Sequence, residues 1–506
     1  MNTVRLCFLA SAAIWCASTA STTSPGVLSL IVSDLPGYHL PLYRRGGRHS
    51  VHQPFNITNI YAQREHAEGR YARVSTEADG NTIERHWRNG KDGVDEHLLS
   101  GAGAAGTWYT TIQVGKPPQT LEVDIDMLNP DFYLIMTTSG RGSKYNTFGN
   151  EGHAPSNNYV HPICRTPTDV FHLRSSASSP IRLTVPVCQP GKYSSHTLAS
   201  SGTILGLAPP SSSRPLSRLS KTKTLLEQLQ DENLIDHNIV SIALFDSTTG
   251  VLSLGGTIAA LVEEVRIRTE KELTYLDRLD IPEERAKMEA EIAGYMFFAM
   301  PPGSTHKDHF KWVDTSNMVA GWHQALMTGI WVNGVKVLKN QPVLFDINCP
   351  FIIAPADAAQ TFYEATPGSR LLSSLIGDAE QQKQAQGFQV VPCLNEVKIE
   401  FELAGWRFPF GRGEAREDAL FGPVGGRFSL GQVHIESGTN SSDEAVETGY
   451  CVGIVIGSTM GIRQDWSQSA MRNVWVLGEP FFRDTGVVFD MGDKKGKGAR
   501  IGVRVF

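Results

Sequence analysis

The stretch QTLEVDIDMLN at residues 119–129 places an acidic residue, Asp126, where a predicted strand ends. Its β-branched and apolar residues favour a strand, and the residues after Asp126 predict a tight connection. A second stretch, QPVLFDINC at residues 341–349, has the same form, with Asp346 at the end of its strand. We therefore expect two related halves of the chain, whose acidic strand ends face each other across a cleft.

The elements around the two aspartates follow a repeated order. Each half has an acidic strand end, a short helix and an apolar-apolar-glycine run, ILG at 204–206 and VLG at 476–478. The chain has 48 glycines and only 19% charged residues, a composition that favours strands joined by tight turns. These patterns predict a mostly β protein.

The N-terminus predicts export from the cytosol. Arg5 precedes an apolar segment at 6–16 and small residues at 18–20, which is typical of a secretory signal peptide over residues 1–20. This segment is too short for a membrane-spanning helix, and no later stretch reaches about 18 apolar residues, so we expect no membrane span. We predict a protein of the secretory pathway that is secreted or vacuolar/lysosomal, with glycosylation acceptors at Asn56 and Asn440.

Two regions lack a regular core pattern. Residues 21–106 are patchy and polar, which is typical of a pro-segment, a flexible arm or a strand added to a later sheet. Residues 257–310 are charged and predict a helical insertion at the surface; the pair His306 and His309 there indicates a solvated turn rather than a metal site.

The charge pattern argues against two classes of function. The net charge of -6 comes without a clustered basic face, so we expect no nucleic-acid partner. The run GAGAAG at 101–106 matches the dinucleotide-binding pattern in its letters, but a strand follows it instead of a helix. A flexible junction is the better interpretation, and no cofactor is expected.

The ordered set of motifs resembles the pepsin-like aspartic peptidases over residues 107–506. The resemblance implies a bilobal fold with two pseudo-symmetric β-rich lobes, 107–256 and 311–506, around a central cleft. Residues 40–42, Leu-Pro-Leu, also resemble the start of that family's pro-segment, which blocks the cleft until it is removed. Besides the two aspartates, the matching motifs in chain order are WYTTI (108–112), GKPPQ (115–119), ILG (204–206), GG (255–256), WVNG (331–334), VLG (476–478) and FD (489–490).

The resemblance implies that Asp126 and Asp346 form a catalytic dyad that hydrolyses peptide bonds. Two carboxyl groups about 3 Å apart cannot both ionise easily, so one stays protonated and they titrate as a pair. The ionised group takes a proton from a water molecule while the protonated group polarises the scissile carbonyl. The expected partner is a polypeptide substrate or peptide ligand, bound by a monomer.

The residues after each aspartate depart from the family's Asp-Thr-Gly pattern. In the family the hydroxyl groups of the two threonines bond across the interface between the lobes. Loss of both is nearly neutral when apolar groups replace both bonding partners. Loss of the glycines predicts backbone strain, most of all at Leu128, and leaves the following residues, Asn129 and Cys349, as replacements for the family's hydroxyls. The positions that differ are Met127, Leu128, Asn129, Ile347, Asn348 and Cys349.

A further departure concerns the hairpin with which the family covers its cleft. This hairpin carries a Tyr and a nearby Gly, and between Asp126 and Ile204 no Tyr stands directly beside a Gly. Tyr159 and Phe171 are the only large aromatic residues at suitable positions, and neither has a glycine beside it. Two functions therefore remain open, an exported endopeptidase made as a zymogen and a non-catalytic relative that binds a peptide or protein in the cleft.

Five cysteines remain after the signal peptide, so at least one is unpaired in the monomer. We expect a disulfide between Cys393 and Cys451 in the second lobe, and by elimination a second between Cys164 and Cys188. Cys349 is the expected free thiol because it lies within the second acidic stretch. No histidine lies near it in sequence, so an inert buried thiol is favoured over a nucleophile.

Overall fold

The computed structural model describes part of the chain. The described residues are 38–45, 56–75, 107–135, 159–161, 164–165, 168–173, 180–188, 203–209, 223–235, 237–244, 249–256, 310–315, 322–393, 397–410, 429–433, 449–458, 473–492 and 498–505. Predictions for the signal peptide, the glycine run, the insertion at 257–310 with its two histidines, and Asn440 lie outside these residues.

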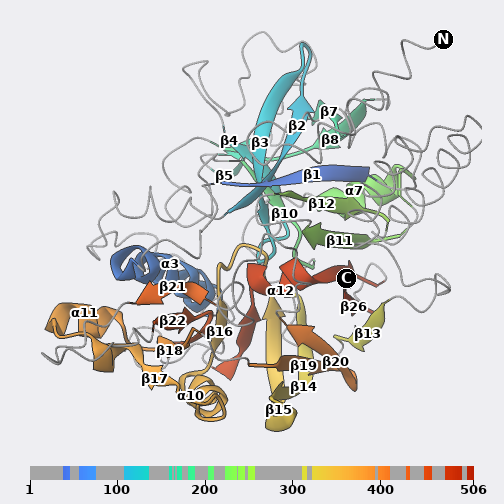
Figure 1. Ribbon diagram of the computed structural model, residues 1–506. Coiled ribbons are helices and arrows are strands. Elements are labelled where there is room, and N and C mark those ends of the chain that lie inside the picture. Colours follow the sequence, from blue (N-terminus) through green and yellow to red (C-terminus); the bar gives the residue numbers. More distant parts are fainter. Residues whose placement is uncertain are drawn as a thin grey trace, which may run out of the picture.

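The described chain is mostly β, as predicted, and its strands form three sheets (Figure 1). The largest has 15 strands, in the order β13 (Lys311–Asp314), β26 (Arg500–Val505), β25 (Thr485–Asp490), β11 (Ile239–Leu244), β12 (Thr249–Leu254), β1 (Tyr38–Arg44), β2 (Trp108–Val114), β3 (Gln119–Asp126), β10 (Ile204–Gly206), β4 (Phe132–Ile135), β9 (Val187–Cys188), β6 (Cys164–Arg165) and β5 (Tyr159–His161). The hairpin of β7 (Thr168–His172) and β8 (Ile181–Thr184) joins it through β2. This sheet therefore combines strands from both predicted lobes.

Two smaller sheets are built from residues after 323. The seven-stranded sheet has the order β20 (Trp406–Phe410), β19 (Ile399–Leu403), β14 (Gln324–Val332), β15 (Val335–Phe345), β24 (Trp475–Leu477), β16 (Ile352–Ala354) and β23 (Val455–Gly457). The four-stranded sheet has the order β17 (Arg370–Leu371), β18 (Gln389–Pro392), β22 (Tyr450–Gly453) and β21 (Ser429–Val433). The described helices are α3 (Ile57–Ser75), α7 (Leu225–Asp231), α10 (Ala356–Glu364), α11 (Ala379–Gln384), α12 (Glu479–Asp484) and the 3₁₀ helix η3 (Leu372–Leu375).

The two acidic strand ends lie in units with the same strand pairing. In the first, β10 runs parallel to β3, with Gly206 opposite Asp126, and antiparallel to β4. In the second, β24 runs parallel to β15, with Leu477 opposite Phe345, and antiparallel to β16. The repeated order in the sequence thus corresponds to a repeated arrangement of strands.

The glycine of each apolar-apolar-glycine run lies against the loop that follows an aspartate. A Cβ added to Gly206 would collide with the carbonyl oxygens of Asn129 and Asp131. A Cβ added to Gly478 would collide with the carbonyl oxygens of Cys349 and Phe351. Because only a hydrogen fits there, these glycines allow a strand to cross close to each acidic turn.

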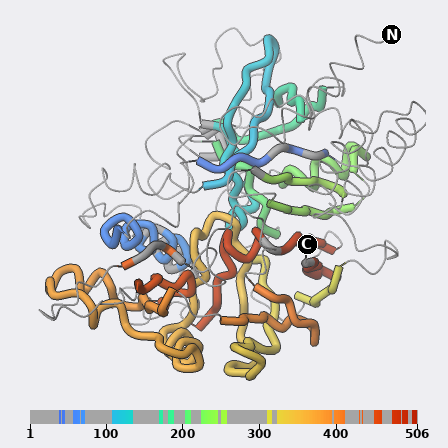
Figure 2. The backbone as a smooth tube through the Cα atoms, in the orientation of Figure 1, coloured from blue at the N-terminus to red at the C-terminus, as the bar shows by residue number. Residues whose placement is uncertain are grey.

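The polar N-terminal region contributes a strand to the large sheet. Residues 38–44 form a strand added to a later sheet, which was one of the three alternatives that the sequence left open. This strand, β1, pairs with β12 on one side and with β2 on the other. Leu40 and Leu42 are buried in the core. Arg44 forms a buried ion pair with Glu479 at the start of α12, at 3.0 Å. Figure 2 shows this early strand among strands from much later in the sequence.

Local signals in the sequence account for several other elements. A hairpin joins β14 to β15 through Asn333 and Gly334, which both have positive φ (48° and 81°), the backbone of a type I′ turn. Helix α7 begins with a capping box of Thr224 and Glu227. It ends at Asp231, and Asn233 with φ 55° follows.

Candidate functional site: two carboxylates under a helix

Asp126 and Asp346 occupy equivalent positions in the two repeated units. Asp126 is the last residue of β3 and is 6% exposed, whereas Asp346 directly follows β15 and is fully buried. In each case the carboxylate oxygen Oδ1 accepts the backbone N–H of the residue two positions later, Leu128 at 2.9 Å and Asn348 at 3.1 Å. The two acidic turns therefore hold their carboxylates in the same way.

One arginine of helix α3 contacts both carboxylates. Arg70 donates from Nη2 to Oδ1 of Asp126 at 3.2 Å and from Nη1 to Oδ2 of Asp346 at 3.1 Å. Both nitrogens belong to one planar guanidinium group, so the two carboxylates lie on opposite sides of a single cation. The structure thus brings together the two aspartates that the sequence analysis paired, with a guanidinium between them.

The guanidinium is held in its charged form. Burial disfavours the charge, but the attraction of Asp346 and then of Asp126 outweighs it and raises the pKa of Arg70 above its ordinary value. The next residue, Tyr71, donates its hydroxyl to Oδ2 of Asp346 at 2.8 Å. Burial and then the Asp346 carboxylate raise the pKa of Tyr71 well above its ordinary value, so this phenol remains a donor.

Helix α3 is anchored on the side of the four-stranded sheet. At its start, Asn56 caps the helix by accepting the N–H of Asn59 at 3.0 Å. The apolar residues Ile60, Ala67 and Tyr71 pack in a core cluster with Phe388, Val390 and Val452 of that sheet and its surroundings. In Figure 1, α3 lies beside α11, and the two helices are in contact.

A second arginine fixes the middle of α3. Arg64 is 1% exposed, and its guanidinium lies over the rings of Tyr61 (5.1 Å) and Phe388 (4.8 Å). It also donates to the carbonyl oxygen of Gln386, close to the end of α11. Stacking and a hydrogen bond act together on the Arg64 side chain. Helix α3 is therefore fixed in its middle by Arg64 as well as near its end by Arg70.

Sequence reasoning missed α3 and therefore missed Arg70 and Tyr71. The helix is polar on average, and the buried set includes Arg64 as well as apolar residues, so no apolar stripe marks the segment. A usable signal was present: Ile60, Arg64, Ala67 and Tyr71 recur at four, three and four positions, the spacing of one helix face. An arginine at one of these positions hid the pattern.

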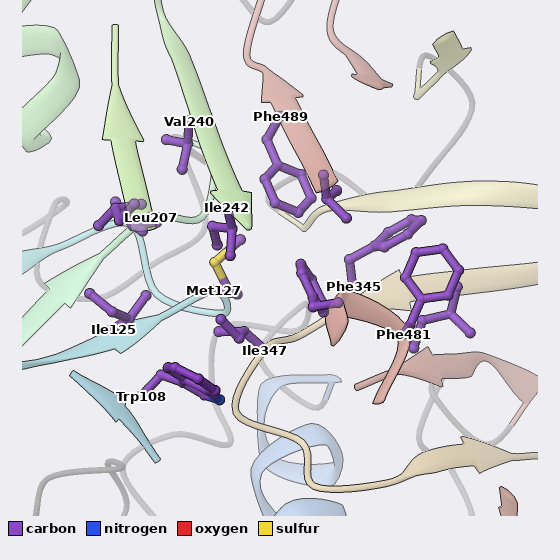
Figure 3. Packing of buried hydrophobic residues seen from close by; sticks show 14 of the residues in the cluster. Trp108, Ile125, Met127, Leu207, Val240, Ile242, Phe345, Ile347, Phe481 and Phe489 are labelled. Carbon is purple, nitrogen blue, oxygen red and sulfur yellow. The ribbon is translucent and has the colours of Figure 1, made fainter. Parts of the chain in front are cut away.

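The apolar replacements of the family's threonines are accommodated by packing. Met127 and Ile347 are both fully buried and belong to one core cluster that spans both repeated units. Figure 3 shows them next to each other, with Ile242 and Trp108 nearby. This agrees with the prediction that replacing both hydroxyls leaves the fold intact, because neither hydroxyl remains without its partner.

Two expectations about these turns need correction. Leu128 was expected to be strained in place of glycine, but it is not among the residues with positive φ, and it packs in the cluster that contains Phe351 and Tyr71. Asn129 was considered as a donor to the carboxylate; its amide oxygen instead accepts the N–H of Asp131 at 2.9 Å, which closes the local turn.

One of the two aromatic residues considered for a covering hairpin, Phe171, is a core residue. Phe171, in β7, is fully buried and packs edge-on against Phe132 with ring centroids 5.6 Å apart. Tyr159 lies in β5, and its side chain is outside the described part of the structure.

The cysteines follow the predictions where the structure describes them. Cys393 and Cys451 form a disulfide, with Cα atoms 4.9 Å apart. The register of β6 and β9 places Cys164 opposite Cys188, so their pairing remains a prediction that the backbone arrangement permits. Cys349 is a buried free thiol, and burial followed by the Asp346 charge raises its pKa to about 12. The thiol is free and buried, as expected, and its inertness remains a prediction.

Comparison of the sequence with family models finds no match, and comparison with curated proteins finds no similar one. Among the described residues, no group of three or more His, Cys, Asp or Glu side chains is arranged to hold a metal ion. No described helix is long and apolar enough to cross a membrane. Functional inference for this chain therefore rests on the geometry around Asp126 and Asp346.

Proposed function

We propose that this chain is the precursor of an exported, pepsin-like aspartic endopeptidase with a bilobal fold, held inactive by helix α3. One observation carries the proposal: a single guanidinium, that of Arg70, contacts two carboxylates that end equivalent strands of two equivalent units. Structural ion pairs do not require such duplicated surroundings. They suit a pair of carboxyl groups that share a proton, because equivalent turns hold both groups in a matched geometry.

The carboxylates provide the chemistry once Arg70 has left. As the resemblance implies, the two carboxyl groups then share one proton, since two carboxyl groups at short distance cannot both ionise easily. The ionised member takes a proton from a water molecule, and the protonated member polarises the scissile carbonyl of a polypeptide. The N–H groups of Leu128 and Asn348 hold Oδ1 of each carboxylate, and the absence of glycine does not remove these bonds.

Helix α3 supplies the inhibition. Arg70 and Tyr71 occupy the space in which a water molecule and a substrate carbonyl would meet the two aspartates. The raised pKa of Arg70 keeps the guanidinium charged, so both ion pairs must be broken before α3 can leave. Breaking buried ion pairs is unfavourable, so α3 stays in place until it is removed.

The decisive experiment separates removal of α3 from the chemistry. Cleavage sites for a specific protease are introduced on both sides of α3, between residues 46 and 55 and between residues 76 and 106, so that β1 stays in the large sheet when α3 leaves. The cut protein is incubated with denatured protein substrates from pH 3 to pH 7. We expect acid-dependent cleavage that a statine-type inhibitor blocks and that the Asp126→Asn and Asp346→Asn variants lack. The matched control is Asp357→Asn, on the exposed side of α10. Absence of cleavage after proven loss of α3, or cleavage that both aspartate variants retain, refutes the proposal.

A second candidate is a non-catalytic relative whose cleft binds a peptide or protein. It is favoured by the depth at which α3 is built into the core: Arg64, Ala67, Glu68 and Tyr71 are all at most 2% exposed. If α3 stays bound down to pH 3 after cleavage on both sides of it, this second function replaces the first. Size-exclusion chromatography of the cut protein, followed by mass spectrometry, distinguishes retained from released α3.

A further inference from the structure

Asn348 makes a connection between the two repeated units that the resemblance to peptidases did not predict. Its side-chain amide leaves the turn after Asp346 and reaches strands β2 and β3 of the other unit. The oxygen Oδ1 accepts the backbone N–H of Trp108 at 2.7 Å, and Nδ2 donates to the carbonyl oxygen of Ile125. Ile125 directly precedes Asp126, so Asn348 connects the surroundings of the two carboxylates.

The amide fits its place because it has the same donor and acceptor as a peptide group. The pairing of β2 with β3 ends at Tyr109 and Asp124, one position before Trp108 and Ile125 would pair. The Asn348 side chain takes the place of that next pair by accepting from one strand and donating to the other. It thereby satisfies two backbone groups in a region where Trp108 and Ile125 are fully buried.

The corresponding residue of the first unit is apolar. Leu128, two residues after Asp126, is buried in a cluster that contains Tyr71 of α3 as well as Leu344 and Phe351 of the second unit. The second residue of each acidic turn is therefore buried, one as an amide and one as an apolar side chain. The backbone N–H of each of these residues also holds the carboxylate of its own turn.

We propose that Asn348 is a positioning residue that fixes the two acidic turns relative to each other, in place of the hydroxyl groups that Met127 and Ile347 cannot supply. The amide acts through backbone contacts and does not touch the reacting atoms. The contribution of Asn348 to catalysis rests on the proposed function. Its hydrogen bonds between the two repeated units do not depend on that function.

The first test measures directly whether Asn348 connects the two repeated units. In Asn348→Leu, which keeps the approximate volume and loses both hydrogen bonds, we expect exchange of the Trp108 N–H with solvent to accelerate about tenfold or more. The control Asn129→Ala removes an amide whose bond stays within its own turn, and it should leave Trp108 exchange unchanged. Equal exchange in wild type and Asn348→Leu overturns the proposal.

A further measurement keeps the proposal testable if Asn348→Leu does not fold. In wild-type protein labelled with ¹⁵N-asparagine, the Nδ2 protons of Asn348 should be protected from exchange because they are donated to the carbonyl oxygen of Ile125. Exchange at the rate of a free amide refutes the contact.

The catalytic arm uses the protein freed of α3. There Asn348→Leu should lower kcat about tenfold or more with KM nearly unchanged, and shift the acid limb of the pH profile, because carboxylate geometry changes while the substrate cleft does not. An unchanged kcat and pH profile removes the positioning role. If the freed wild-type protein itself is inactive, the proposed function fails, and Trp108 exchange still decides whether Asn348 joins the units.

Discussion

Replacement of Arg70 by methionine should loosen helix α3 strongly at neutral pH. The change keeps a long side chain but removes a cation from between two carboxylates; the side chains of Arg70, Asp126 and Asp346 are 6%, 9% and 0% exposed. Breaking a buried ion pair by removing one partner costs about 3–5 kcal/mol. At about 1.4 kcal/mol per factor of ten, the lower value corresponds to at least a hundredfold change in the opening equilibrium of α3.

Hydrogen exchange of the α3 amides measures this effect without assuming two-state unfolding of the whole chain. We expect Arg70→Met to lower their protection at least a hundredfold at pH 7.

The matched control is Lys383→Met. Its ion pair with Glu380 has side chains 73% and 70% exposed, and such exposed pairs contribute less than about 1 kcal/mol. Protection of α3 in Arg70→Met within about threefold of this control at pH 7 would show that the guanidinium does not hold the helix. The proposed inhibition by Arg70 would then be wrong.

Two further predictions concern the turns beside the carboxylates. Cys349, with its pKa raised to about 12, should not react with iodoacetamide at pH 8 until the protein unfolds; its contribution to stability is full below its ordinary pKa of 9.0 and is lost as the pH rises towards about 12. Rapid alkylation of native protein contradicts this. Gly478→Ala should lower the free energy of unfolding by about 1–3 kcal/mol, because its Cβ would collide with backbone oxygens, while Gly377→Ala, where a Cβ meets nothing within 4 Å, should not. Equal melting temperatures for the two variants would refute the close approach at Gly478.

Much of the fold was accessible from the sequence because its signals are local. The alternation in residues 119–126 predicts a strand wherever that segment is placed, and Asn333-Gly334 favours one turn type through its backbone alone. The repeated order of acidic strand end and apolar-apolar-glycine run likewise indicated two equivalent units. Strand pairing around Asp126 and Asp346 agrees with that prediction.

The site was accessible only in part. Asp126 and Asp346 could be paired because each ends a strand of the same pattern. Arg70 could not be assigned to them, because an arginine in a polar segment has the same local signal whether it faces solvent or two carboxylates. Asn348 was noted only as the loss of a glycine, since nothing near it in sequence shows the strands that its amide joins.

The sequence by itself determined the elements with a regular local pattern. These are the two acidic strand ends, the glycines that lie against the loops after them, and the short turns and helices. Only the tertiary structure decided what surrounds the carboxylates, with Arg70 between them and Asn348 joining their turns. The physical reason is that backbone preferences act between near neighbours in the chain. Buried polar side chains, in contrast, gain stability only from partners that folding brings to them from distant positions.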